Sequence, residues 1–176
     1  MIKTPRLLLE PISVAHSTEM YHGLIDTALY EFIDDEPPIS IDSLKSRYAR
    51  LEKHVSPEGS DGRERPLNWI LRERGDSGRC IGYVQATVKP GKTASLAYVL
   101  FRQCWGVGYA LEAVGATIIH LHRRRGVNYF HALTDRRNTR SINLLSKLCF
   151  RKTASQHSIP APELLIIDES EYVFEV

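Results

Sequence analysis

The sequence has few cysteines and no long apolar run. Its three cysteines, Cys80, Cys104 and Cys149, stand too far apart to form a CxxC pair. A zinc or redox site of that kind is therefore excluded, and we expect reduced thiols in the core and no bound metal. No segment approaches the ~18 consecutive apolar residues that a membrane helix requires. We expect no membrane partner and, by default, a cytoplasmic protein.

The chain also lacks a strong charge of either sign. Lys and Arg number 23 against 21 Asp and Glu, which leaves a formal net charge of +2. So small a charge creates no long-range field toward nucleic acid, so we expect no nucleic-acid partner and look only for a local anion site. The length of 176 residues, with 43% hydrophobic and 25% charged residues, predicts one folded domain over residues 1–176.

Apolar periodicity predicts the order of helices and strands. Apolar residues recur every three or four positions from Leu111 to Leu121 and stop at Gly126, which is typical of a helix and its C-terminal glycine. Strand, helix and strand between Val99 and Thr134 make one parallel crossover in an otherwise antiparallel sheet, so the fold class is α+β, mixed. The other predicted elements are strands over Arg6–Pro11, 67–72, 80–88, 93–101 and 127–134, helices over Ser13–Ala28, from Ser40 or Ser43 to Val55 and over Asn138–Leu148, an exposed loop over 56–66, and a closing hairpin within 163–176 around Asp168–Ser170.

The segment from Trp105 to Ala110 (WGVGYA) joins a predicted strand to the longest predicted helix. Such a junction directs unpaired backbone N–H groups and the positive end of the helix dipole to one point, where a phosphate fits. Glycine at 106 and 108 removes Cβ atoms that would hold a pyrophosphate away from these amides. An ordinary tight turn has the same composition, so the loop alone predicts only an anion site.

Two nucleotide-binding alternatives fail at single positions. A dinucleotide-binding loop would need its third glycine at Leu111 and would follow an early strand. A P-loop ending at Gly91-Lys92-Thr93 would need a glycine at Ala86 and would not lie in a strand-to-strand turn.

Five segments in this order resemble the GNAT acyltransferases, and within them the branch that acetylates ribosomal-protein amino termini and related amines. The resemblance covers nearly the whole chain. It implies a mostly antiparallel twisted sheet, flanked by helices and splayed at its central parallel strand pair. It also implies acetyl transfer from acetyl-CoA to a primary amine, on a protein N-terminus or a small molecule, by direct attack in a ternary complex. The segments are RLLLEP (Arg6–Pro11), CIGYV (Cys80–Val84), LAYVLF (Leu96–Phe101), WGVGYALEAV (Trp105–Val114) and NTRSINLLSKLCF (Asn138–Phe150).

The resemblance further implies roles for individual residues. Ser141 falls where this branch places a hydroxyl near the CoA sulfur, so it is the candidate general acid. Asn138 falls where the family places a side-chain amide on the pantetheine arm. A backbone N–H near Leu100 would stabilise the oxyanion. The implied cofactor-binding residues are Tyr98, Val99 and Leu100 on the strand, Trp105, Gly106, Val107, Gly108, Tyr109 and Ala110 in the loop, and Asn138.

Four residues depart from the family pattern. Val107 stands where the family often has Lys or Arg, which removes one phosphate-facing charge. Leu145 replaces the tyrosine that many relatives use as acid, and Cys149 replaces a glycine. Ser95 stands where several relatives carry a glutamate base, so the general base is unassigned.

The acceptor is open. In the family the link between the first two helices walls the acceptor site, and here the acidic stretch Glu31–Glu36 would favour a cationic amine, although a solvated surface is the simpler interpretation. His131 could act as a base through water, or have only a structural role. The cationic helix end from His120 to Arg125 stabilises the helix dipole, or contacts the CoA 3′-phosphate.

Two further questions stay open. A non-catalytic acyl-CoA-binding regulator on the same fold is the main alternative to an enzyme. Tyr172, Phe174 and Val176 share one face of the predicted terminal hairpin, which leaves a homodimer through this face open.

Overall fold

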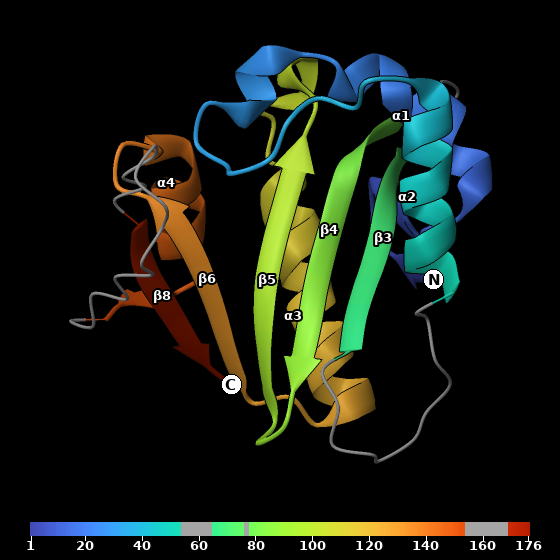
Figure 1. The fold of residues 1–176 in the computed structure, drawn as a ribbon. Coiled ribbons are helices and arrows are strands. Elements are labelled where there is room, and N and C mark those ends of the chain that lie inside the picture. Colours follow the sequence, from blue (N-terminus) through green and yellow to red (C-terminus); the bar gives the residue numbers. More distant parts are fainter. Residues whose placement is uncertain (54–64, 76–77, 154–168) are drawn as a thin grey trace.

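One mixed sheet organises the chain. The computed structural model describes residues 1–53, 65–75, 78–153 and 169–176. Within them eight strands follow the order β1-β2-β3-β4-β5-β6-β8-β7, and only β5 and β6 pair in parallel (Figure 1). The strands are β1 (Ile2–Lys3), β2 (Leu7–Pro11), β3 (Arg65–Glu73), β4 (Cys80–Lys89), β5 (Thr93–Leu100), β6 (Tyr129–Asp135), β7 (Arg151–Lys152) and β8 (Glu169–Glu175). The predicted α+β, mixed fold class is confirmed.

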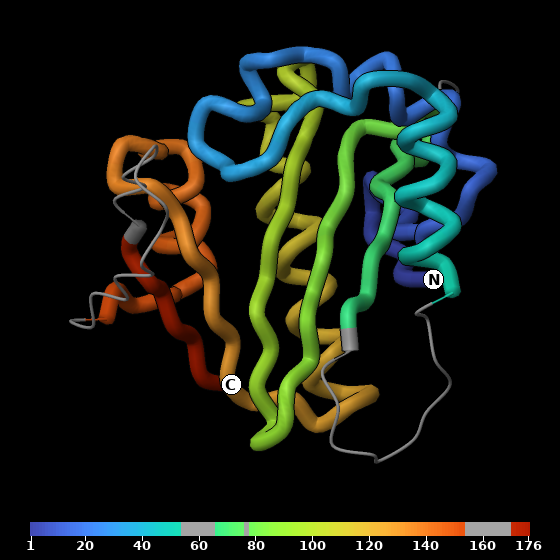
Figure 2. Tube along the Cα trace, viewed as in Figure 1, coloured from blue at the N-terminus to red at the C-terminus, as the bar shows by residue number. Residues whose placement is uncertain are grey.

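The parallel pair is short. β5 and β6 are in register only from Thr93↔Tyr129 to Ser95↔His131, although β5 continues to Leu100 and β6 to Asp135. The two strands diverge beyond that point, as the widening wedge between them in Figure 2 shows. The expected splay at the central parallel pair is therefore present.

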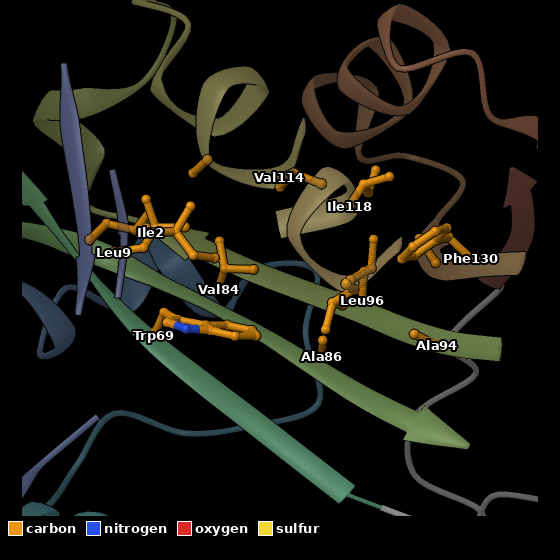
Figure 3. Packing of buried hydrophobic residues seen from close by; sticks show 14 of the residues in the cluster. Ile2, Leu9, Trp69, Val84, Ala86, Ala94, Leu96, Val114, Ile118 and Phe130 are labelled. Carbon is orange, nitrogen blue, oxygen red and sulfur yellow. The ribbon is translucent and has the colours of Figure 1, made fainter. Parts of the chain in front are cut away.

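Helices cover both faces of the sheet. The helical segments are η1 (Val14–His16), α1 (Ser17–Leu24), η2 (Thr27–Tyr30), α2 (Ile41–Lys53), η3 (Arg102–Cys104), α3 (Tyr109–Arg125) and α4 (Thr139–Lys147). Val114 and Ile118 of α3 pack with Val84, Leu96 and Phe130 on one face (Figure 3). Side chains of α1 and α2 form a second cluster on the other face. None of the helices within the described ranges is long and apolar enough to cross a bilayer.

The N-terminal helix differs from the prediction. A continuous helix over Ser13–Ala28 is wrong, because the segment consists of η1, α1 and η2. The break follows Ile25, which is the C-cap of α1. Asp26 then caps η2, because its side chain accepts a hydrogen bond from the Ala28 N–H at 3.0 Å. Short polar side chains that bind their own backbone favour such caps over a helix interior.

Several other predictions were correct in part. α2 begins at Ile41 after reciprocal hydrogen bonds between Ser40 and Ser43, while Val55 lies outside the described residues. Most of the predicted loop over 56–66 is also outside them, and Pro66 belongs to β3. Residues 163–168 of the predicted hairpin are likewise not described. A turn at Glu169 and Ser170 is wrong, because both belong to β8, which pairs with β6 and β7.

The face considered for a homodimer is partly used within the chain. Tyr172 is 6% exposed in the main core, and the half-buried Phe174 packs against Phe150 and Phe130, with ring centroids 5.5 and 6.5 Å apart. Val176, the third residue of this face, is 51% exposed, so a homodimer through this face stays a prediction.

The expectation that all three cysteines are core thiols is wrong for Cys149. Cys80 and Cys104 are buried, and burial raises the pKa of each, to about 12 for Cys80. Cys149 is exposed, with φ of 64° directly after α4, where the Phe150 N–H donates to the Leu145 carbonyl at 2.9 Å. It occupies the left-handed position that usually ends a helix with glycine.

An ion pair joins the N-terminal segment to the start of α3. The Glu112 carboxylate accepts hydrogen bonds from the Thr4 hydroxyl at 2.5 Å, the Arg6 N–H at 2.8 Å and the Arg6 side chain at 2.6 Å. The Arg6 guanidinium also donates to the Val107 carbonyl at 2.9 Å and lies 4.7 Å from the centroid of the Tyr109 ring. The connection between β1 and β2 therefore holds the loop that precedes α3.

Replacing Cys149 with glycine should stabilise the protein. A side chain in the left-handed region costs about 1 kcal/mol, which glycine does not incur. Cys149→Gly should raise the free energy of unfolding by about that amount in urea denaturation. Gly126, with φ of 63° after α3 and open space around it, is the matched control, because Gly126→Ala should have the opposite sign. A neutral or destabilising Cys149→Gly would contradict this explanation.

The Glu112 cluster predicts a pH dependence of stability. Burial alone would raise the pKa of Glu112, but hydrogen bonds from Thr4 and Arg6 hold it below the ordinary 4.5. A carboxylate whose pKa is lowered by folding stabilises the fold above its unfolded pKa and loses this contribution as the pH falls through its folded pKa. Glu112→Gln should cost about 1 kcal/mol at pH 7, since Arg6 is half-exposed.

The measurement is Tm between pH 3 and 7 for both proteins. The difference between wild type and Glu112→Gln should be constant above about pH 5 and shrink below pH 4.5. Glu36→Gln, at an exposed loop position, should leave the curve unchanged. A difference that does not depend on pH would rule out a role for the Glu112 charge.

Candidate functional site

A cavity of about 360 Å³ lies at the C-terminal end of β5, where that strand has left β6. Four parts of the chain surround it: the end of β5, the loop before α3, the inner face of α4 and the segment around η2. The lining residues are Ala28, Leu29, Phe32, Ile33, Tyr98, Val99, Leu100, Cys104, Trp105, Gly106, Gly108, Tyr109, Ala110, Leu111, Asn138, Arg140, Ser141, Asn143, Leu144 and Lys147.

The loop before α3 forms an anion-binding geometry. Gly106 and Gly108 have φ of 77° and 86°, a left-handed conformation that only glycine adopts without strain. The first intrahelical bond runs from the Glu112 N–H to the Gly108 carbonyl, so the preceding backbone N–H groups of α3 take no part in the helix ladder. Tyr109 and Ala110, which carry two of these groups, line the cavity. The helix dipole adds a positive potential there.

The end of β5 forms the opposite wall. Within the described residues, no strand pairs with the β6 side of β5 beyond Ser95, so its backbone edge is open to the cavity. The Trp105 indole N–H donates to the Leu100 carbonyl at 2.7 Å, which joins the strand end to the loop. A ligand arm that carries amides could pair with this edge as an additional strand would.

Tyr98 and Ser141 meet across the cavity. The Tyr98 hydroxyl of β5 lies 2.7 Å from the Ser141 hydroxyl of α4. Burial raises the pKa of Tyr98 to about 12, against the lowering effect of the Ser141 hydrogen bond. The Ser141 backbone N–H donates to the Asn138 side-chain oxygen at 3.1 Å, so Asn138 is the N-cap of α4. The capping bond fixes the turn that carries Ser141.

Cations border the cavity on the α4 side. The Arg140 guanidinium lies 4.0 Å from the centroid of the Trp105 ring, and Lys147 is a further lining residue on the same helix. Arg137 bridges two elements, since it pairs with Asp135 at 2.8 Å and lies 5.7 Å from the centroid of the Phe32 ring. The cavity therefore has positive charge at one wall. Most of its interior is apolar, because residues such as Leu29, Ile33 and Leu100 line it.

Most of the residues predicted for the site lie together. Of the predicted residues, Val107 alone is not among the lining residues: it is 52% exposed, and its carbonyl faces Arg6. Those that line the cavity are Tyr98, Val99, Leu100, Trp105, Gly106, Gly108, Tyr109, Ala110, Asn138 and Ser141.

Several lining residues were not predicted. Arg140, Leu144 and Lys147 recur at i, i+4 and i+7, the spacing of one helical face, and this signal could have identified them. Phe32 and Ile33 are the apolar pair inside the acidic stretch, and they turn toward the cavity while the neighbouring carboxylates stay exposed.

The histidines among the described residues lie outside the cavity lining. His131, the last β6 residue that is in register with β5, pairs with Glu171 at 3.0 Å. His122 contacts the Val127 carbonyl at 3.0 Å, and His120 packs edge-on against Trp69. The pKa of His120 is lowered, mainly by burial and to a smaller extent by nearby positive charges. These contacts support structural roles at the end of α3. The described residues hold no group of three or more His, Cys, Asp or Glu suited to a metal ion.

Comparison with solved structures shows the same fold over nearly the whole chain. A GNAT-family acetyltransferase from Bacillus anthracis is 18% identical, with a TM-score of 0.81 over 99% of this chain and 97% of that one. The microcin C7 self-immunity acetyltransferase MccE, in complex with acetyl-CoA and AMP, is 13% identical, with a TM-score of 0.84 over 98% and 94%. RimL, a ribosomal L7/L12 N-acetyltransferase in complex with coenzyme A, is 14% identical, with a TM-score of 0.80 over 98% and 96%.

The sequence itself matches a family model. No curated protein sequence matches the chain. The model described as an acetyltransferase (GNAT) domain does match, over residues 6–151, which includes β5, the glycine loop, α3 and α4. Since that match spans most of the chain, this protein belongs to the GNAT acetyltransferase family.

Proposed function

We propose that residues 1–176 act as one cytoplasmic domain that transfers the acetyl group of acetyl-CoA to a primary amine. The observation that carries the proposal is the convergence of three features on one cavity. These are the open edge of β5, the left-handed glycine loop at the start of α3, and a hydroxyl pair between β5 and α4.

The residues present suit acetyl-CoA. The backbone N–H groups after Gly108 suit its pyrophosphate, and the open edge from Tyr98 to Leu100 suits the amides of the pantetheine arm. The solved structures of MccE with acetyl-CoA and of RimL with coenzyme A, both on this fold, support the assignment. Asn138 can donate its amide N–H groups to pantetheine while its oxygen caps α4.

Cations from other elements would compensate for the charge lost at Val107, and one of them, Arg6, is also paired with Glu112. Arg6 donates to the Val107 carbonyl, and Arg140 and Lys147 border the cavity from α4. Three cations supplied by other elements therefore lie near the loop or the cavity, and we expect CoA affinity to depend on them.

The chemistry needs few protein groups. A neutral amine attacks the thioester carbonyl, a backbone N–H near Leu100 stabilises the oxyanion, and Ser141 gives a proton to the leaving thiolate. No covalent enzyme intermediate is needed, because orienting the amine against the thioester supplies much of the rate. The acceptor enters beside Phe32 and Ile33, and the carboxylates next to them attract a cationic amine, on a protein N-terminus or a small molecule.

Acetyl-CoA should stabilise the purified protein. A ligand that binds only the native state adds about 2.7 kcal/mol when its concentration is 100 times its Kd. We expect a rise in Tm that grows with the logarithm of acetyl-CoA concentration, and no comparable rise with ATP or NAD. No shift at millimolar acetyl-CoA would refute the proposal, and a selective shift with ATP or NAD would indicate a different enzyme class.

Ser141→Ala should reduce turnover much more than binding. The loss of a general acid lowers kcat by about 10²-fold, whereas KM for acetyl-CoA should change little. Ser146→Ala, at an exposed position of the same helix, is the matched control. Equal loss of CoA binding and turnover would remove Ser141 as the acid. Acetyl-CoA binding without turnover of any amine by the wild type would favour the non-catalytic regulator.

A further inference from the structure

The contact between Tyr98 and Ser141 joins the two sides of the splayed sheet. Tyr98 is on β5 and Ser141 is 43 residues later on α4, and their hydroxyl oxygens are 2.7 Å apart. Both side chains line the cavity. A helical serine commonly donates to the carbonyl one turn earlier, but the described contact of this hydroxyl is with Tyr98.

We propose that Tyr98 is a positioning residue that aims the Ser141 hydroxyl and replaces its proton, so that the two hydroxyls form a proton relay to the leaving thiolate. This inference rests on the proposed acetyl transfer and adds the source of the proton. It assigns a function to the phenol of Tyr98, separate from the backbone edge that binds pantetheine.

A serine hydroxyl alone is a weak acid for this step. An alkoxide is far more basic than a thiolate, so a proton given up by an isolated serine returns to it. A phenol is a much stronger acid than an alcohol, because the ring delocalises its charge. When Ser141 takes a proton from Tyr98 as it gives its own to sulfur, the charge ends on the phenolate and no alkoxide forms.

The relay balances. The amine nitrogen bonds to the thioester carbon, and the carbon–sulfur bond breaks with its electron pair passing to sulfur. Sulfur takes the Ser141 proton, and Ser141 takes the Tyr98 proton. The nitrogen loses one proton as the amide forms, and that proton returns through water to the Tyr98 phenolate. The products are the acetylated amine and the CoA thiol, with both hydroxyls restored.

The surroundings suit this role. Burial raises the pKa of Tyr98 to about 12, so transfer of its proton toward a thiolate is uphill and the phenolate lasts only until it takes up the proton that the amine nitrogen loses. Asn138 fixes the Ser141 backbone by accepting its N–H, which leaves the side chain free to turn between Tyr98 and the cavity.

The test begins with Tyr98→Phe, which keeps the ring and removes the hydroxyl. We expect kcat to fall about tenfold, less than for Ser141→Ala, while KM for acetyl-CoA and the rise in Tm with acetyl-CoA stay near wild type. Tyr83→Phe is the matched control, because it removes a phenol from the neighbouring strand β4 outside the cavity lining, and its kcat should equal that of wild type. The Tm of Tyr98→Phe checks that this variant folds.

Two measurements separate a relay from a packing role. In the double variant Tyr98→Phe/Ser141→Ala, kcat should equal that of Ser141→Ala alone, because residues that act as a unit are not additive. In mixtures of H₂O and D₂O, kcat is plotted against the deuterium fraction of the solvent. For the wild type this plot should be curved, because two protons move in the same step. For Tyr98→Phe it should be a straight line, because only one proton moves.

Three outcomes would overturn the relay while the acetyl transfer stands. They are an unchanged kcat in Tyr98→Phe, losses that multiply in the double variant, and a straight line for the wild type. Absence of turnover in the wild type with every amine tested would overturn the proposed function and the relay together.

Discussion

β5 and β6 run side by side for only three residue pairs, and the site depends on that early separation. Past Ser95 the edge of β5 keeps its hydrogen-bonding groups without a strand partner in the described part of the chain. Unpaired backbone groups inside a protein cost free energy unless a ligand or water satisfies them. The interruption therefore creates both the space for a ligand and a reason for an amide-bearing ligand to occupy it. α4 and the η2 segment close the space from either side.

Charge in this site comes from several elements rather than from the loop itself. Val107 brings none, while Arg6 reaches the loop from the beginning of the chain, where Glu112 holds its guanidinium. Arg140 stacks on Trp105 from α4. The phosphate site proposed for this loop would therefore depend on packing between distant elements. A substitution at Arg6 or Glu112 would consequently disturb the loop without touching its sequence.

The sequence predicted the regular parts of this molecule well. The apolar repeat of α3 and the apolar runs of β3 to β5 result from burial on one or two faces of each element. Such burial places apolar residues at regular positions, so the sequence displays it directly. The glycine loop and about half of the cavity lining followed from position and family resemblance. Other features depend on contacts that no local pattern encodes. The break at Ile25 and Asp26 is set by a cap, the inward turn of Phe32 and Ile33 by the cavity beside them, and the exposure of Cys149 by the end of α4.

The link from Thr4 and Arg6 to Glu112 spans more than one hundred residues, and it affects the order in which the protein can fold. α3 has its own apolar face and closing glycine, so it can form early against the strands before it. The loop at its start gains its last support only when β2, which follows Arg6, docks beside β3. Contacts between residues so far apart in sequence form late, because closing the long chain segment costs entropy. We therefore expect the folding protein to acquire its sheet and α3 before it can bind acetyl-CoA, the cofactor proposed above, so that affinity for acetyl-CoA would report on completed folding.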